Sequence, residues 1–176
     1  GAMTDSVSLL HNLEAERAAL GAVLIDPSLW PDLSAILTPG DYFRRANGLI
    51  HAELAYLTMR GQVIDAVVLR DSLTQRGRMD DIGGPVYLFA LTDGVPRSAN
   101  VTYYARIVKD LARRRALYLR LRDAGTAVLD GDTSGALAGL RDHIDEAAAA
   151  LDDADLLLEP AAVVAARERL TPARSL

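Results

Sequence analysis

Apolar residues recur at helical spacing along most of this chain, and no stretch shows the alternation of apolar and polar residues that marks a β-strand. A clear example is the stretch 13–24, where Leu13, Leu20 and Leu24 fall on one face with small alanines between them. Half of the residues are apolar but only 5% are aromatic, so aliphatic side chains and alanine must fill the core. The pattern predicts an all-α fold.

Residues with known preferences for helix ends divide this pattern into separate helices. Asn12 is suited to cap the first helix, and Glu14 and Glu16 lie in its first turn, where the helix dipole favours negative charge. Asp26-Pro27 ends that helix, because a residue before proline is disfavoured in the α region. Asp65 can cap a later helix. We expect helices near 12–24, 31–37, 44–59, 66–76 and 85–91, with Gly61 and Gly77 closing two of them in the left-handed conformation, and then a long helical pattern from about 100 toward 130.

The composition changes near Arg113. Before it, short helices separated by Gly and Pro turns indicate a compact multi-helix globular head over 12–112. After it, two longer helices near 113–129 and 134–151 have a short connection, which predicts an antiparallel helical hairpin over 113–152.

The two ends of the chain are expected to lie outside these units. Gly1-Ala2-Met3 resembles an expression-tag remnant, and residues 1–11 are expected to be flexible. The acidic stretch Asp152–Asp155 is expected to break the second hairpin helix. Residues 153–176 then read as a linker toward an absent C-terminal domain, with a short helix over 159–170 that begins at Pro160.

The hairpin has more apolar surface than one opposing helix can cover. Leu137, Leu140 and Ile144 follow a heptad-like spacing on the second helix, and leucines on the first helix can face them. Such a thin pair of helices needs a partner, which could be the head or another subunit. The residues expected to mediate self-association are Leu117, Leu121, Val128, Leu137, Leu140, Ile144 and Leu151.

Three consecutive arginines, Arg113, Arg114 and Arg115, form the densest basic cluster of the chain. They could contact DNA phosphates, or they could lie on a solvated helix face or pair with acids on the other hairpin helix. We favour the second interpretation because acidic residues lie on the partner helix of the same hairpin. Since the net charge is also −5, we expect DNA contact to be weak or absent. The expected acidic partners are Asp142, Asp145 and Glu146.

The composition also excludes several classes of protein. The absence of cysteine excludes disulfides and thiolate metal sites and fits a cytoplasmic protein. No apolar run approaches the length of a membrane span, so no membrane partner is expected.

No arrangement of residues predicts a catalytic, cofactor-binding or metal site. A phosphate-binding loop needs glycines before a Lys-Ser/Thr pair, whereas Lys109, the single lysine, lies in a stretch without glycine. His11, His51 and His143 fall in different elements without the spacing of metal ligands, and surface or internally hydrogen-bonded histidines are the better interpretation.

Five groups of residues form a characteristic series along the chain. They are Asn12–Gly21, Asp41-Tyr42-Phe43, Gly61–Asp65, Leu73 with Gly77 and Gly83–Leu88, and Pro96 with Asn100 and Tyr104–Val108. In order and spacing they resemble the N-terminal domain of DnaB-type replicative helicases. None of them is a catalytic motif, so the resemblance concerns the fold.

The resemblance implies an assembly domain of a hexameric helicase. In that family this domain builds a trimer-of-dimers collar and offers a surface for primase and a helicase loader. The ATPase that unwinds DNA, with its ATP and Mg²⁺, would lie in an absent C-terminal domain, and the parent would function in the bacterial cytoplasm. The alternative is a stand-alone dimeric helical adaptor or regulator that shares the fold.

Overall fold

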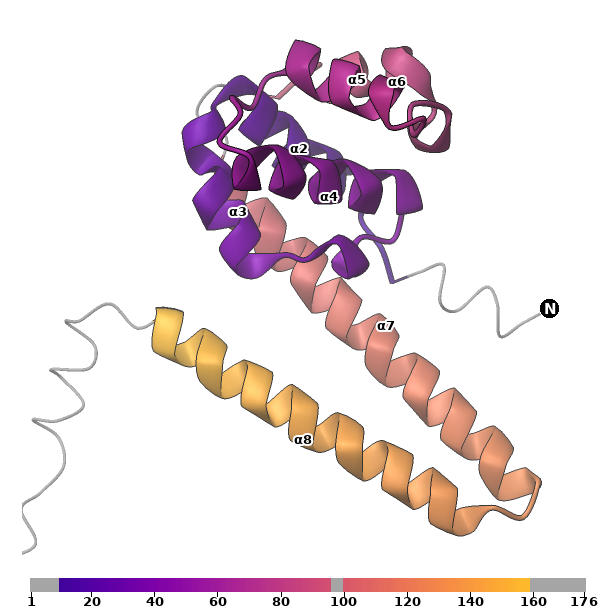
Figure 1. The fold of residues 1–176 in the computed structure, drawn as a ribbon. Helices are drawn as coiled ribbons and strands as arrows, with labels where there is room; N and C mark the ends of the chain where they lie inside the picture. Colours follow the sequence, from indigo (N-terminus) through magenta and orange to yellow (C-terminus); the bar gives the residue numbers. More distant parts are fainter. Residues whose placement is uncertain (1–9, 96–99, 159–176) are drawn as a thin grey trace, which may run out of the picture. The chain divides into compact units, whose positions relative to one another are not determined.

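A computed structural model describes residues 10–95 and 100–158, and every regular element in these ranges is helical (Figure 1). This confirms the predicted all-α fold. The α-helices are α2 (Leu13–Ile25), α3 (Trp30–Ile36), α4 (Arg45–Met59), α5 (Ala66–Gln75), α6 (Gly84–Ala90), α7 (Val101–Leu129) and α8 (Thr133–Leu158). Short 3-10 turns lie at η1 (Pro27–Leu29), η2 (Pro39–Asp41) and η3 (Asp80–Ile82).

The helix ends form where the sequence predicts them, because their signals are local. The Asn12 side chain accepts a hydrogen bond from the Ala15 amide at 2.9 Å at the start of α2. The Asp65 carboxylate accepts from two amides of the first turn of α5. Gly61 and Gly77 follow α4 and α5 with φ of +66° and +65°, the left-handed conformation that glycine adopts most readily.

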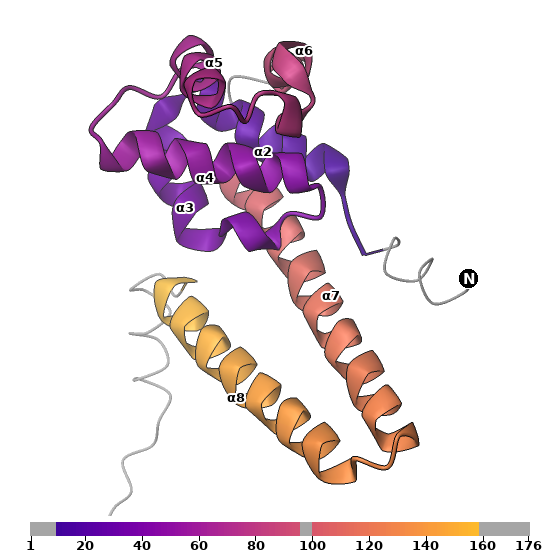
Figure 2. The same ribbon diagram turned by 45° about the vertical axis from the view of Figure 1, so that its right-hand side comes forward.

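The chain divides into two compact units, 1–116 and 117–176. In the first unit, which we call the head, α2 packs against α3 and α4, and α5 packs against α4 and α6 (Figure 2). Leu20, Leu54 and Leu88 are fully buried in the common core. Gly21 lets α2 approach the segment after α6, since a Cβ at that position would lie 2.0 Å from the Leu91 carbonyl oxygen.

Residues of α6 and α7 complete the core of the head. Leu88 and Val108 are buried in the core cluster, and Tyr87, Tyr104 and Ile107 pack against it while partly buried.

The second unit contains the end of α7, the turn 130–132 and α8, which form the predicted antiparallel hairpin (Figure 1). Gly131 has a φ of +88° in the turn, and the Asp132 carboxylate accepts from the Gly135 amide at the start of α8. α7 runs without a break from Val101 to Leu129, as the long helical pattern predicted, so the change of composition near Arg113 is not a helix start. One helix limit differs from expectation: α8 runs through Asp152–Asp155 to Leu158, so these acids do not break the helix as predicted. The expected helix at 159–170 and the proposed tag at 1–3 lie outside the described residues.

Candidate functional site

The hairpin exposes the apolar side chains that the heptad-like pattern singled out. Leu117, Leu121 and Val128 on α7, with Leu137 and Ile144 on α8, are between 45% and 65% exposed. Leu140 is half-buried, and the side chain of Leu151 lies outside the described part. Ala136 is buried at the turn end of α8. We call these five exposed side chains and Leu140 the hairpin apolar side.

The three consecutive arginines have different surroundings. Arg114 is exposed and pairs with Asp110 one turn earlier on α7, with Nη2 2.8 Å from Oδ2. Arg113 is exposed, and its predicted pairing with the acids of α8 stays a prediction. Those acids, Asp142, Asp145 and Glu146, are all exposed.

Arg115 is not on a solvated face, which corrects the prediction for this residue. Arg115 is 9% exposed, and its guanidinium donates to the carbonyl oxygens of Leu10, at 2.7 Å, and Asp41. Burial lowers the pKa of Arg115 from its ordinary value, and the carboxylates of Glu16 and Asp41 oppose that shift. The sequence could not show this position of Arg115, because the oxygens that accept its hydrogen bonds belong to residues more than 70 positions away in the sequence.

A buried carboxylate organises the start of α4. Glu16 is 1% exposed and accepts from the Phe43 amide at 2.7 Å, the Arg44 amide at 3.3 Å and the Asn47 side-chain amide at 2.7 Å. Arg44, the residue before α4, has no side-chain capping bond of its own. Glu16 therefore supplies, from α2, the negative charge that favours this helix start.

The same network extends to α6. The Tyr87 hydroxyl donates to the Asn47 side-chain oxygen at 2.6 Å, and the Arg44 guanidinium lies 4.0 Å from the centre of the Tyr87 ring. The sequence analysis placed Glu16 in a first turn but missed this role. A signal was present, because Glu16 shares a helix face with the apolar Ala19, Leu20 and Val23.

A buried histidine of α4, one turn after Asn47, pairs with a tyrosine that precedes the helix. His51 is 3% exposed, and its Nδ1 lies 3.0 Å from the Tyr42 hydroxyl. Burial lowers the pKa of His51 to about 4, while nearby Asp41 opposes the shift. Burial first, and then the charges of Glu16 and Asp41, raise the pKa of Tyr42. A protonated hydroxyl and a neutral imidazole therefore share this hydrogen bond, with the donor set by the tautomer of His51. This is the internally hydrogen-bonded histidine that the sequence favoured.

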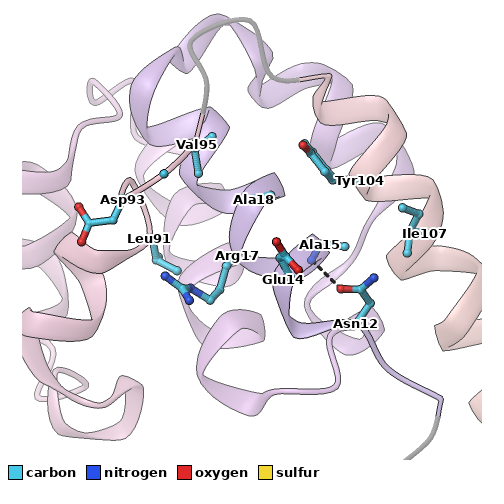
Figure 3. A pocket seen from close by; sticks show the side chains of 11 residues that line it. Asn12, Glu14, Ala15, Arg17, Ala18, Leu91, Asp93, Val95, Tyr104 and Ile107 are labelled. Atoms are coloured by element: carbon cyan, nitrogen blue, oxygen red, sulfur yellow. Dashed lines mark hydrogen bonds between the residues drawn. The ribbon is translucent and has the colours of Figure 1, made fainter.

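The head also contains a surface cavity of about 390 Å³ between α2, the segment after α6 and α7 (Figure 3). Its polar lining includes Glu14, Arg17 and Asp93, and its apolar lining includes Leu91 and Ile107. Arg17 donates to the Ala90 carbonyl oxygen at 3.0 Å. We find no nucleophile beside a general base among these lining residues.

Two further findings concern the described ranges 10–95 and 100–158 alone. They contain no group of three histidine, cysteine, aspartate or glutamate side chains arranged to hold a metal ion. None of their helices combines the length and apolar character needed to cross a bilayer.

Comparison with known proteins gives consistent matches. The family model for the DnaB-like helicase N terminal domain matches residues 8–110. The replicative DNA helicase DnaB of Treponema pallidum (strain Nichols) is 43% identical over 123 residues, which cover 70% of this chain and 28% of that protein. The replicative DNA helicase DnaB of Geobacillus stearothermophilus is 38% identical over 145 residues, covering 82% of this chain and 29% of that protein.

A solved structure matches as well. The crystal structure of the N-terminal domain of DnaB helicase from Mycobacterium tuberculosis aligns with a TM-score of 0.65 and 33% identity, over 75% of this chain and 97% of that one. The chain spans 28% and 29% of the length of the two curated relatives above. The family match covers more than half of the chain, and the fold agrees with it, so the chain belongs to the DnaB-like helicase N-terminal domain family.

Proposed function

We propose that this chain is the assembly and partner-binding domain of a hexameric replicative DNA helicase of the bacterial cytoplasm. It forms a collar from a trimer of dimers and docks primase or a helicase loader. The motor that uses ATP and Mg²⁺ to unwind DNA lies in another part of the parent protein. The family membership and the names of the matching helicases support this proposal.

The observation that carries the proposal is the hairpin apolar side. Leu121, Leu137 and Ile144 are each more than half exposed, and they recur at the heptad-like spacing that the sequence showed. Single exposed apolar side chains are common, whereas several on one helix face indicate an interaction surface. A second hairpin of the same kind can cover such a surface, because four antiparallel helices bury their apolar stripes in one bundle. Self-association is therefore the function that the exposed residues favour.

The test replaces one apolar side chain with a charge. Ile144→Lys should weaken the oligomer in sedimentation velocity, because a buried, unpaired ammonium is costly. Ala138→Lys is the matched control: it adds the same charge at an exposed position about 120° around α8 from Ile144. We expect the control to assemble like the unmodified chain. A monomer at high concentration for the unmodified chain would contradict the proposal, as would equal loss of assembly in both variants.

The proposal that the parent protein contains an ATPase motor is tested by sequencing its full reading frame. The frame should encode a phosphate-binding Gly-x4-Gly-Lys-Ser/Thr loop after the segment described here, and a frame without it would favour the adaptor alternative. We expect this chain itself to bind DNA weakly or not at all, because its net charge is −5 and Arg115 is occupied inside the head.

A further inference from the structure

Two cationic side chains of α7 converge on one turn of the head. Lys109 Nζ lies 3.1 Å and 2.9 Å from the two carboxylate oxygens of Asp41, and Arg115 donates to the backbone oxygen of the same residue. The segment between α3 and α4, which contains Asp41, accordingly runs beside α7 in both ribbon views (Figures 1 and 2). Asp41 is thus bound through its side chain and its main chain by the same helix.

Asp41 is itself firmly placed. Its carboxylate accepts from the amide and the hydroxyl of Thr38, which closes the η2 turn as a capping box. Two residues later, the buried Glu16 carboxylate holds the Phe43 amide. The side chains of α7 therefore bind to a turn that other hydrogen bonds already fix.

Arg115 also joins a third segment. Its second donor group reaches the Leu10 carbonyl oxygen, just before α2, while the adjacent His11 ring stacks on Phe43 with centroids 4.3 Å apart. The planar fork of arginine can donate to two oxygens in fixed directions, whereas a lysine ammonium is a single point donor. The contact thus depends on arginine rather than on positive charge alone.

Arg115 lies where α7 leaves the head. It is the last α7 residue that is buried, and the head ends one residue later, at Ala116. Beyond Arg115 no described α7 side chain is buried: Tyr118 and Leu119 are half-buried, and Leu117 and Leu121 are 45% and 53% exposed. We propose that Asp41, Lys109 and Arg115 form a clamp that fixes α7 at the point where it leaves the head, and so limits the motion of the hairpin relative to the head.

A neighbouring ion pair on α7 does not connect the helix to the rest of the head. Arg114 pairs with Asp110 on the same helix, and both side chains are more than half exposed. That pair links α7 only to itself. Arg114→Met is therefore a matched control for Arg115→Met, because each removes one guanidinium from adjacent positions.

The absence of cysteine makes a distance measurement direct. We would place spin labels at Gln75→Cys on α5 and Ala138→Cys on α8, two exposed positions, and record pulsed electron–electron distance distributions. The Ile144→Lys background is measured at a concentration where sedimentation velocity shows a monomer, so contacts between copies do not contribute. Helix content by circular dichroism checks that each variant is folded.

Arg115→Met should broaden the distribution roughly twofold, because the segment beyond the last anchor gains freedom. Arg115→Lys should not restore the narrow distribution, and Lys109→Met should broaden it less. Arg114→Met should leave it unchanged. If Arg115→Met does not fold, Lys109→Met still tests the clamp, since Lys109 is only partly buried.

Three results would overturn the proposal: an unchanged width in folded Arg115→Met, equal broadening in Arg114→Met, or an unmodified distribution as broad as that of the variants. The role of the clamp in presenting the hairpin for assembly rests on the proposed function, whereas the distance measurement on monomers does not. A chain that never self-associates could still show the clamp, and a chain without a clamp could still assemble.

Discussion

The head encloses a packed core of fully buried leucines, whereas the described leucines of the hairpin stripe are exposed or half-buried. In the head, Leu20, Leu54 and Leu88 have no exposed surface, and the buried polar groups Glu16 and His51 have hydrogen-bond partners. In the hairpin, the predicted apolar stripe is mostly open to solvent. Burial of apolar side chains therefore stabilises the head from within, while the hairpin has exposed apolar surface that a partner can cover.

This contrast predicts the largest difference for leucine truncation. Leu54→Ala should lower the free energy of unfolding by about 2–5 kcal/mol, because it opens a cavity in a packed core. Leu137→Ala should change it by less than about 0.5 kcal/mol in a dilute monomeric sample, since 65% of that side chain is already exposed. Urea denaturation followed by circular dichroism measures both. Similar losses in the two variants would show that the hairpin is packed within one copy.

What the sequence predicted well follows from local rules. Asn12 and Asp65 bond to amides three residues away or nearer, and Gly61 needs only its own backbone freedom, so these positions could be identified without tertiary knowledge. The hairpin stripe was visible for the same reason, since helical spacing is local. The spacing of the apolar residues does not show which partner covers them, so self-association through the stripe stays a proposal.

What the sequence did not show depends on residues distant along the chain. Glu16 meets its partners 27 to 31 residues later, and Arg115 meets Asp41 across 74 residues. Both residues have charges and sit beside other charged residues, which is typical of a solvated face. Their burial follows only when α4 and the η2 turn pack beside α2 and α7.

The second prediction uses pH to perturb the head alone. The pKa of His51 falls from 6.5 in the unfolded chain to about 4 in the head, so the folded state binds fewer protons between these values. Stability should therefore fall as the pH is lowered through this window, by about 3 kcal/mol for this group. Chemical denaturation at pH 7 and at pH 4 measures the effect.

Other groups titrate in the same window, so a variant isolates His51. His51→Gln keeps an acceptor for the Tyr42 hydroxyl but has no titrating ring, and its stability should depend less on pH than that of the unmodified chain. Parallel pH profiles for the two proteins would count against a neutral, buried His51.

The smallest expected effect on stability comes from a comparison of Glu14 and Glu16, the two acids in the first turn of α2. Glu16→Gln should lower the free energy of unfolding by about 1–3 kcal/mol, because the new NH₂ group faces amides that themselves donate. Glu14→Gln removes the same charge from an exposed position, so its cost should stay within about 0.5 kcal/mol. Equal costs in denaturant titrations would mean that the charge near the helix end matters and the buried network does not. A larger loss for Glu16 alone would show that the carboxylate acts through α4, by binding the amides that precede it.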